Sequence, residues 1–239
     1  MAVFEDTPDR LDDAFEPGTI AAKGLFPTPL ISARVAGHRA LDLELSATIL
    51  AREQAEQGVV VSNQGGWHSA DFARWCGPAG RTILDAARAL VDHMTVTQNG
   101  AEFVPAVVGW YVTAWANVNR AGHANRAHAH PGAFWSGIYW VDDGGAGADP
   151  SRGGMLELAD PRGIMPSMYA PQLHCAIVAC HGAGQGQSVT PEAGTIVLFP
   201  SWLIHSVTPY LGDSARISVA FNFSLNGIAP PSPADSDRT

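Results

Sequence analysis

Cysteine is scarce in this chain, and its three residues, Cys76, Cys175 and Cys180, are an odd number. So few cysteines exclude a disulfide framework and suit a reducing compartment. The sequence also lacks a basic and apolar leader at its start, and it lacks any apolar run near twenty residues. These absences argue against secretion and against a membrane-spanning helix. We therefore expect a cytoplasmic protein.

Basic residues are also few, since 14 Lys and Arg stand against 23 Asp and Glu and give a formal net charge of -9. Nucleic acids and anionic membranes bind clustered Lys and Arg, so we expect neither as a partner. What remains is 239 residues with 46% hydrophobic and 15% charged content, which is enough for one large core. The expected partner is an unidentified small-molecule or protein substrate, and a homodimer is compatible with the composition.

The chain divides into two tails and one domain. Residues 1–18 are acidic, and residues 229–239 are rich in Pro, Ser and Asp, so both ends are predicted to be disordered. Residues 19–228 contain neither a repeat nor a linker and form the predicted single domain. In its first part, residues 38–57 and 81–96 carry apolar residues at helical spacing, and each is predicted to form a helix.

From Phe103 onward the sequence changes to short β-rich runs between Gly, Pro, Asn and Asp. The predicted strands are residues 104–118, 134–141, 153–160, 174–180, 195–200 and 216–223. His174 and His181 flank one of these runs, and an extended chain would hold them about 23 Å apart, too far for one zinc ion. Helices followed by many strands indicate a mainly β, α+β protein: a sandwich or jelly roll whose outer face is covered by an N-terminal helical layer.

Two histidine motifs supply the candidate metal ligands. In RAHAHP, His128 and His130 project from one face if the segment is extended, with Cβ atoms roughly 6.5 Å apart. In the later run, His205 precedes a turn centred on Gly212 and Asp213, and an alternating strand begins at Arg216. A hairpin about that turn puts His205 opposite Ala220, on the face that also carries Arg216. The pattern predicts a metal beside the histidines and a carboxylate clamp roughly 13 Å along the strand.

These motifs resemble those of the 2-oxoglutarate and Fe(II)-dependent oxygenase superfamily, and within it a group of uncharacterised bacterial and phage oxygenases. The resemblance is carried by LFPTPL, SNQGGWHS, the W-x-N and H-x-H-P series, SGIYW, FPSWLIHSV and RISVAFNF, over residues 25–223. It implies a cupin-like double-stranded β-helix that uses Fe(II) and 2-oxoglutarate, most simply to hydroxylate its substrate. His128, His130 and His205 correspond to the metal ligands, and Arg216 and Ser218 to the Arg-x-Ser pattern that binds the co-substrate.

Polar residues near these motifs extend the predicted site. Asn117 and Asn222 are either polar lining of the co-substrate pocket or residues that end strands. Four tryptophans, at positions 115, 135, 140 and 202, either line the cavity or pack in the core. The segment of residues 62–69 is a lid, a loop beside the substrate, or only the turn that joins two helices.

One position departs from the superfamily pattern, because His130 stands where most members have Asp or Glu. The ligand set is then three neutral imidazoles, unless Glu157 supplies a carboxylate from elsewhere in the chain. Three-histidine iron sites also occur in cupin-like dioxygenases that use no oxo acid. The sequence therefore leaves two alternatives open: such a dioxygenase, and a metal-containing binding protein without catalytic activity.

Overall fold

The structure is a computed structural model that describes residues 21–22, 25–163, 170–177 and 180–229. The predicted tails, 1–18 and 229–239, lie outside the described residues except for Ala229, the last residue of a strand. The order of elements follows the sequence prediction, since two long helices precede most of the strands. None of the helices in the described part of the chain has both the length and the apolar character that a bilayer span requires.

The described strands form two facing antiparallel sheets. The larger sheet has the order β1-β11-β8-β13-β6-β3, and the smaller has the order β10-β9-β12-β7-β2. The larger contains β1 (Ile31–Arg34), β3 (Trp67–His68), β6 (Val107–Asn119), β8 (Trp135–Asp142), β11 (Thr195–Pro200) and β13 (Arg216–Ala229). The smaller contains β2 (Asn63–Gln64), β7 (Ala124–His128), β9 (Leu156–Leu158), β10 (Gln187–Val189) and β12 (His205–Val207). This arrangement is the predicted jelly roll, or double-stranded β-helix.

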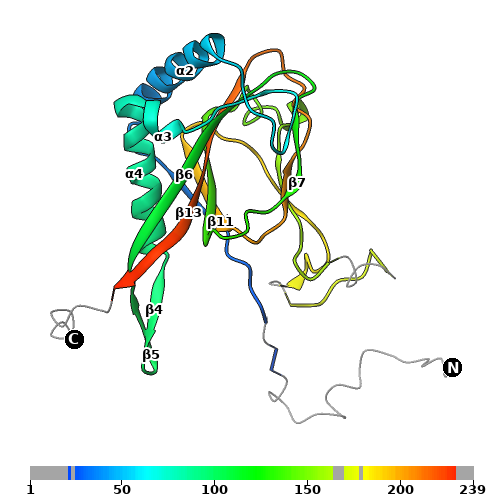
Figure 1. Cartoon of the computed structure of the whole chain (residues 1–239). Coiled ribbons are helices and arrows are strands. Elements are labelled where there is room, and N and C mark those ends of the chain that lie inside the picture. The colour runs from blue at the N-terminus through cyan, green and yellow to red at the C-terminus, as the bar shows by residue number, and fades with distance from the viewer. Residues whose placement is uncertain (1–20, 23–24, 164–169, 178–179, 230–239) are drawn as a thin grey trace.

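Helices cover the outer face of the larger sheet, on the side away from β7 (Figure 1). They are α2 (His38–Ala55), α3 (Phe72–Trp75) and α4 (Gly77–His93), and β4 (Val96–Asn99) and β5 (Glu102–Pro105) form a separate hairpin below them. A short 3-10 helix, Pro150–Arg152, precedes β9. Apolar residues of α2 and α4, such as Leu45 and Ile83, pack on outward-facing residues of the sheet in one buried cluster. The predicted helical layer is therefore confirmed.

Alternate side chains of β13 lie on opposite faces of the larger sheet, one towards the apolar core under the helices and one towards the candidate site. Ile217, Val219, Phe221 and Phe223 face the helices and belong to the outer apolar cluster. The intervening residues, beginning with Arg216, therefore face the smaller sheet. The same parity puts Asn117 and Trp115 of β6 on this inner face, because they pair with Ser218 and Ala220. The space between the sheets thus receives polar residues of two neighbouring strands, β6 and β13.

The predicted hairpin between the His205 and Arg216 segments is wrong. β12 pairs with β7 and β9 in the smaller sheet, whereas β13 pairs with β6 and β8 in the larger. Residues 208–215 carry the chain from one sheet to the other, and Tyr210 forms an isolated bridge with Gly153 on the way. His205 lies directly opposite His128 instead of Ala220.

The predicted strand at residues 174–180 is also wrong for its described part, where the chain is irregular and turned. The adjacent edge of β9 is already occupied by β10, so this apolar run has no strand to pair with there. The chain folds back instead, and Nδ1 of His174 lies 2.8 Å from the carbonyl oxygen of His181. The large separation expected for these two histidines is therefore wrong as well.

Candidate metal centre

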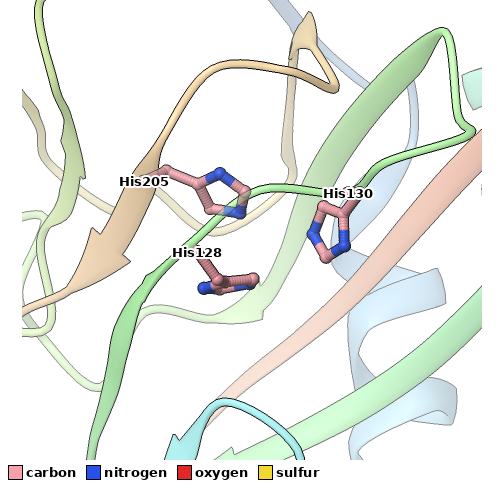
Figure 2. Close-up of side chains that lie close together, drawn as sticks. All are labelled: His128, His130 and His205. Atoms are coloured by element: carbon pink, nitrogen blue, oxygen red, sulfur yellow. The ribbon is translucent and has the colours of Figure 1, made fainter.

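Three histidines meet between the sheets (Figure 2). His128 ends β7, His130 follows it, and His205 begins β12. One potential ligand atom from each ring lies within 4.8 Å of the other two. Two imidazole nitrogens bound at about 2.1 Å to one ion are about 3 Å apart when they are cis, so small side-chain movements close the set on a metal. The ring centroids of His128 and His205 are 4.3 Å apart.

Backbone carbonyls fix which ring nitrogen faces the centre. Nδ1 of His128 is 2.7 Å from the carbonyl oxygen of Arg126, and Nδ1 of His205 is 2.9 Å from that of Leu203. A carbonyl oxygen only accepts hydrogen bonds, so in both rings Nδ1 donates. In a neutral ring the other nitrogen, Nε2, then keeps its lone pair, which is the arrangement that a metal ligand needs.

Burial keeps two of these rings neutral. The pKa of His130 is lowered to about 4, first by burial and then by the neighbouring His205 and His128. Burial likewise lowers the pKa of His205 to about 4, and the hydrogen bond to Leu203 only partly opposes this effect. At neutral pH both rings are therefore unprotonated, as ligands must be.

No carboxylate joins the three histidines in the described part of the chain. Glu157 was the sequence candidate, but it pairs with Ser206, the neighbour of His205, while Leu158 pairs with His205. Glu157 therefore projects from the opposite face of the smaller sheet from His205. The ligand set consists of imidazoles alone.

Arg216 lies across the same cavity, on the larger sheet. Its side chain is only 2% exposed, and its Nε and Nη2 have no hydrogen-bond partner among the described residues. Burial lowers its pKa to about 10, although Tyr210 and Asp143 favour the charged form, so the guanidinium is cationic at neutral pH. A buried, unpaired guanidinium is costly unless an anion joins it. The environment of Arg216 therefore favours the binding of an anionic ligand.

The close approach of one backbone segment holds this arginine in place. Gly154 has φ +68, and a Cβ atom added there would lie 2.9 Å from both Cδ and Nε of Arg216. Only glycine combines this left-handed backbone with such a contact. The stem of Arg216 thus lies against the loop that precedes β9, and the ring of Tyr210 also lies close to Gly154.

The other predicted co-substrate residues divide into two groups. Ser218 and Asn117 are buried and line the inner cavity together with Arg216 and the three histidines. Asn222 does not line that cavity; its carboxamide accepts a hydrogen bond of 2.7 Å from Ser136, and it borders a second hollow closer to the surface. Contact with the co-substrate therefore remains a prediction for Ser218 and Asn117, and the position of Asn222 favours it less.

Comparison with known proteins agrees with this geometry. Residues 113–222 match the model of a family described as "Putative 2OG-Fe(II) oxygenase". The chain is therefore similar to 2OG-Fe(II) oxygenases over this segment. The matched segment runs from β6 into β13 and includes the three histidines and Arg216. No curated protein matches this chain by sequence.

Solved structures with the same fold include several 2OG oxygenases. A prolyl-4-hydroxylase from Pseudomonas putida has 15% identity, with 84% of this chain and 94% of that chain covered and a TM-score of 0.57. A prolyl hydroxylase from Trichoplax adhaerens, in complex with a hypoxia inducible factor peptide, has 12% identity, coverage of 82% and 83%, and a TM-score of 0.56. The epimerase SnoN from nogalamycin biosynthesis has 13% identity, coverage of 82% and 76%, and a TM-score of 0.55. At these identities the likeness concerns the fold.

The donor set fits the cofactors that the matched family implies. Three neutral imidazoles suit Fe(II), and the unpaired Arg216 suits the distal carboxylate of 2-oxoglutarate. His128, His130 and His205 would hold the metal, and Arg216 the co-substrate. Together, iron and the oxo acid supply the oxidising power for chemistry at a C–H bond.

Of the four tryptophans considered from the sequence, only Trp115 lines the cavities. Trp135 packs in the outer core, Trp140 is buried in the apolar layer between the sheets, and Trp202 is 55% exposed. Trp115 contacts the ring of His130 at 5.5 Å between centroids. It therefore forms a wall of the cavity beside His130.

A second cavity of about 550 Å³, here called the outer hollow, adjoins the histidines on the side towards solvent. The segment of residues 62–69 contributes Ser62 and His68 to it, but it contains the short strands β2 and β3 and is neither a plain loop nor a turn between helices. Arg126 also lines the outer hollow. Neither His68 nor Arg126 was predicted to be functional, because a single histidine in a glycine-rich turn and a single arginine on a strand resemble ordinary surface residues.

Proposed function

We propose that this protein is a non-haem Fe(II) oxygenase that uses 2-oxoglutarate to hydroxylate a substrate. In this proposal His128, His130 and His205 bind the metal, and Arg216 with Ser218 binds the distal carboxylate of the co-substrate. The three cysteines form no disulfide, which supports a cytoplasmic location for the enzyme. The match of residues 113–222 to a 2OG-Fe(II) oxygenase family supports the reaction class.

The observation that carries the proposal is the state of Arg216. Its guanidinium is buried and lacks partners for Nε and Nη2, yet it lines one cavity with the three histidines. A buried guanidinium without hydrogen-bond partners lowers the stability of the folded protein. A bound carboxylate, which has two acceptor oxygens, offsets this loss. A metal-binding protein without a co-substrate has no use for this arrangement.

The residues of the chain then have distinct tasks. The imidazoles present unprotonated nitrogens, and the carbonyls of Arg126 and Leu203 hold two of the rings in orientation. Arg216 would hold the far carboxylate of the oxo acid in the cavity that the three histidines also line. Phe199, whose ring contacts His205 at 4.8 Å, and Trp115 restrict water around the centre.

The Arg216→Gln variant tests this proposal. We expect it to bind 2-oxoglutarate at least about tenfold more weakly, because one charge-assisted contact is lost, while its iron content stays unchanged. Calorimetric titration of 2-oxoglutarate into anaerobic Fe(II)-loaded protein, with metal analysis of the same samples, gives both values. Arg39→Gln, at an exposed position of α2, is the matched control. Equal affinity of the wild type and Arg216→Gln would refute the assigned role.

Because the candidate ligands are all imidazoles, a second function is compatible with the site: a three-histidine dioxygenase that uses no oxo acid. The two functions differ in their dependence on 2-oxoglutarate. We expect iron-dependent oxygen uptake by the purified protein to require 2-oxoglutarate and to release succinate. Uptake that is the same without 2-oxoglutarate would support the alternative, and the absence of any iron-dependent uptake would support a binding protein.

A further inference from the structure

The outer hollow has a single charged side chain in its lining, and that side chain is Arg126. Its other polar lining residues are uncharged or histidine, and small or apolar residues such as Val61, Ala127 and Ala129 supply the rest. The hollow also shares Ser62, Trp115, His128 and His130 with the inner cavity that contains Arg216. The histidines therefore separate two spaces, each provided with one arginine.

Arg126 lines this space from β7, two residues before His128. The register between β7 and β12 shifts between Asn125 and His128, so the strand is irregular at Arg126. Its backbone is fixed, since its N–H donates to the carbonyl of Ser62 at 2.9 Å and its own carbonyl accepts from His128.

The guanidinium of Arg126 forms no ion pair or hydrogen bond with any described residue. Seven other arginines of the described chain are ion-paired with a nearby carboxylate. In an acidic protein with abundant carboxylates, an unpaired arginine at the mouth of a cavity is available to a ligand.

A second feature, His68, points to a ligand in the same hollow. It pairs with Asn117 in the sheet register, so its side chain projects from the inner face of the larger sheet. The ring is stacked on Trp115 with centroids 5.5 Å apart and planes 16° apart, and the side chain of Asn117 forms a hydrogen bond to it. Only 7% of His68 is exposed, and its Nδ1 is buried without a partner. The unused nitrogen is a second place for a polar contact.

We propose that the outer hollow binds the primary substrate and selects a small carboxylic acid with an apolar body. The carboxylate pairs with Arg126, the body lies against Trp115, and a polar group meets Nδ1 of His68. This inference rests on the proposed function, which supplies the oxidising centre at His128 and His130. A volume of about 550 Å³ suits a small molecule. One arginine without a helix N-terminus beside it suits a monoanion better than a phosphate dianion.

A matched pair of probes tests the selection of a charge. 3-Phenylpropionate and 3-phenylpropionamide have the same apolar body, and only the first is anionic. The full chain, loaded with Zn(II) and 2-oxoglutarate so that no oxidation occurs, is titrated with each compound, and tryptophan fluorescence reports binding. We expect the acid to bind at least about tenfold more tightly than the amide, as one charge-assisted pair provides.

Two variants separate the roles of the two residues. Arg126→Gln is expected to remove the preference for the acid, while Arg39→Gln retains it. His68→Phe keeps a ring on Trp115 and removes the nitrogens; because neither probe carries a second polar group, this variant should leave both affinities and their ratio unchanged. Equal wild-type affinities, a preference that survives in Arg126→Gln, or no binding of either compound would overturn the proposal.

The same samples distinguish this failure from failure of the proposed function. Binding of 2-oxoglutarate to the Zn(II)-loaded wild type is measured first, without a probe. If 2-oxoglutarate binds and the acid has no advantage, only the substrate inference is wrong. If 2-oxoglutarate does not bind, the proposed function fails whatever the probes show. Circular dichroism of each variant confirms that it is folded.

Discussion

The third imidazole is the most informative single residue. His130 stands where a carboxylate is usual in the superfamily, and the structure brings no other carboxylate to the described ligand group. Its ring contacts Trp115, His128 and His205, so its position is fixed from three sides. These contacts hold the ring of His130 beside the other two candidate ligands.

Substitution of His130 tests whether it binds the metal. His130→Ala should weaken iron binding by more than the roughly 10- to 100-fold that loss of a hydrogen-bond partner to a ligand costs, because a ligand itself is lost. His130→Asp should retain iron, since a carboxylate is also a ligand for Fe(II). Competition of both variants with a colorimetric chelator under anaerobic conditions measures this difference. Iron binding by His130→Ala at wild-type strength would show that the residue is not a ligand.

At the scale of elements, α2 is attached to the larger sheet by a buried polar cluster. Asp42 accepts a hydrogen bond from the hydroxyl of Tyr139 on β8, and it also lies 2.8 Å from Nδ1 of His38. The Tyr139 side chain is fully buried, and burial together with Asp42 raises its pKa, so it remains a hydrogen-bond donor. The cluster fixes the helix over the strand that also borders the inner cavity.

Tyr139→Phe removes one donor and leaves the Asp42 carboxylate short of a partner. We expect the free energy of unfolding to fall by about 1–3 kcal/mol, the cost of an unsatisfied buried polar group. Urea denaturation followed by circular dichroism measures this change. Tyr111→Phe, at a position that is 62% exposed, is the control and should change little. A loss of stability of the same size in both variants would argue against the role of the cluster.

The elements themselves could largely be predicted from the sequence, whereas their pairing could not. Alternation identified β13 and its inner residues Arg216 and Ser218, and helical spacing identified α2 and α4. Alternation states which residues share a face, but it does not state which strand lies beside it. For that reason the His205 segment was assigned to the wrong sheet. Arg216 still shares a cavity with His205, because the inner faces of both sheets bound the same space.

The sequence predicted those site residues whose type and spacing are typical of a known kind of site. The spacing of His128 and His130 indicated a metal pair, whereas Arg126 in the same strand gave no signal. Its importance depends on the absence of a partner and on the cavity in front of it, and both are properties of the folded chain. The same holds for the buried nitrogen of His68.

For the whole molecule, the metal centre joins strands that are weakly connected otherwise. β12 has three residues, and its register with β7 shifts between His205 and Val207. A metal that binds only the folded chain stabilises it by about 2.7 kcal/mol at a concentration of 100 times its Kd. For a chain of this size that corresponds to a rise in Tm of about 5–10 °C.

Differential scanning fluorimetry with and without Fe(II), under anaerobic conditions, measures that rise. His205→Ala should abolish it, because the ligand from β12 is lost. Arg39→Gln should show the full rise. If His205→Ala gains as much as the wild type, iron binds elsewhere on the molecule.

The uncharged ligand set also determines the sign of the electrostatic potential in the cavity between the two sheets. With iron bound, three neutral rings leave both metal charges uncompensated, and Arg216 adds a third. The dianionic oxo acid neutralises two of these, so a positive excess persists inside a protein whose net charge is -9. Small inorganic anions such as chloride should be drawn into this space and should compete with the organic ligands there.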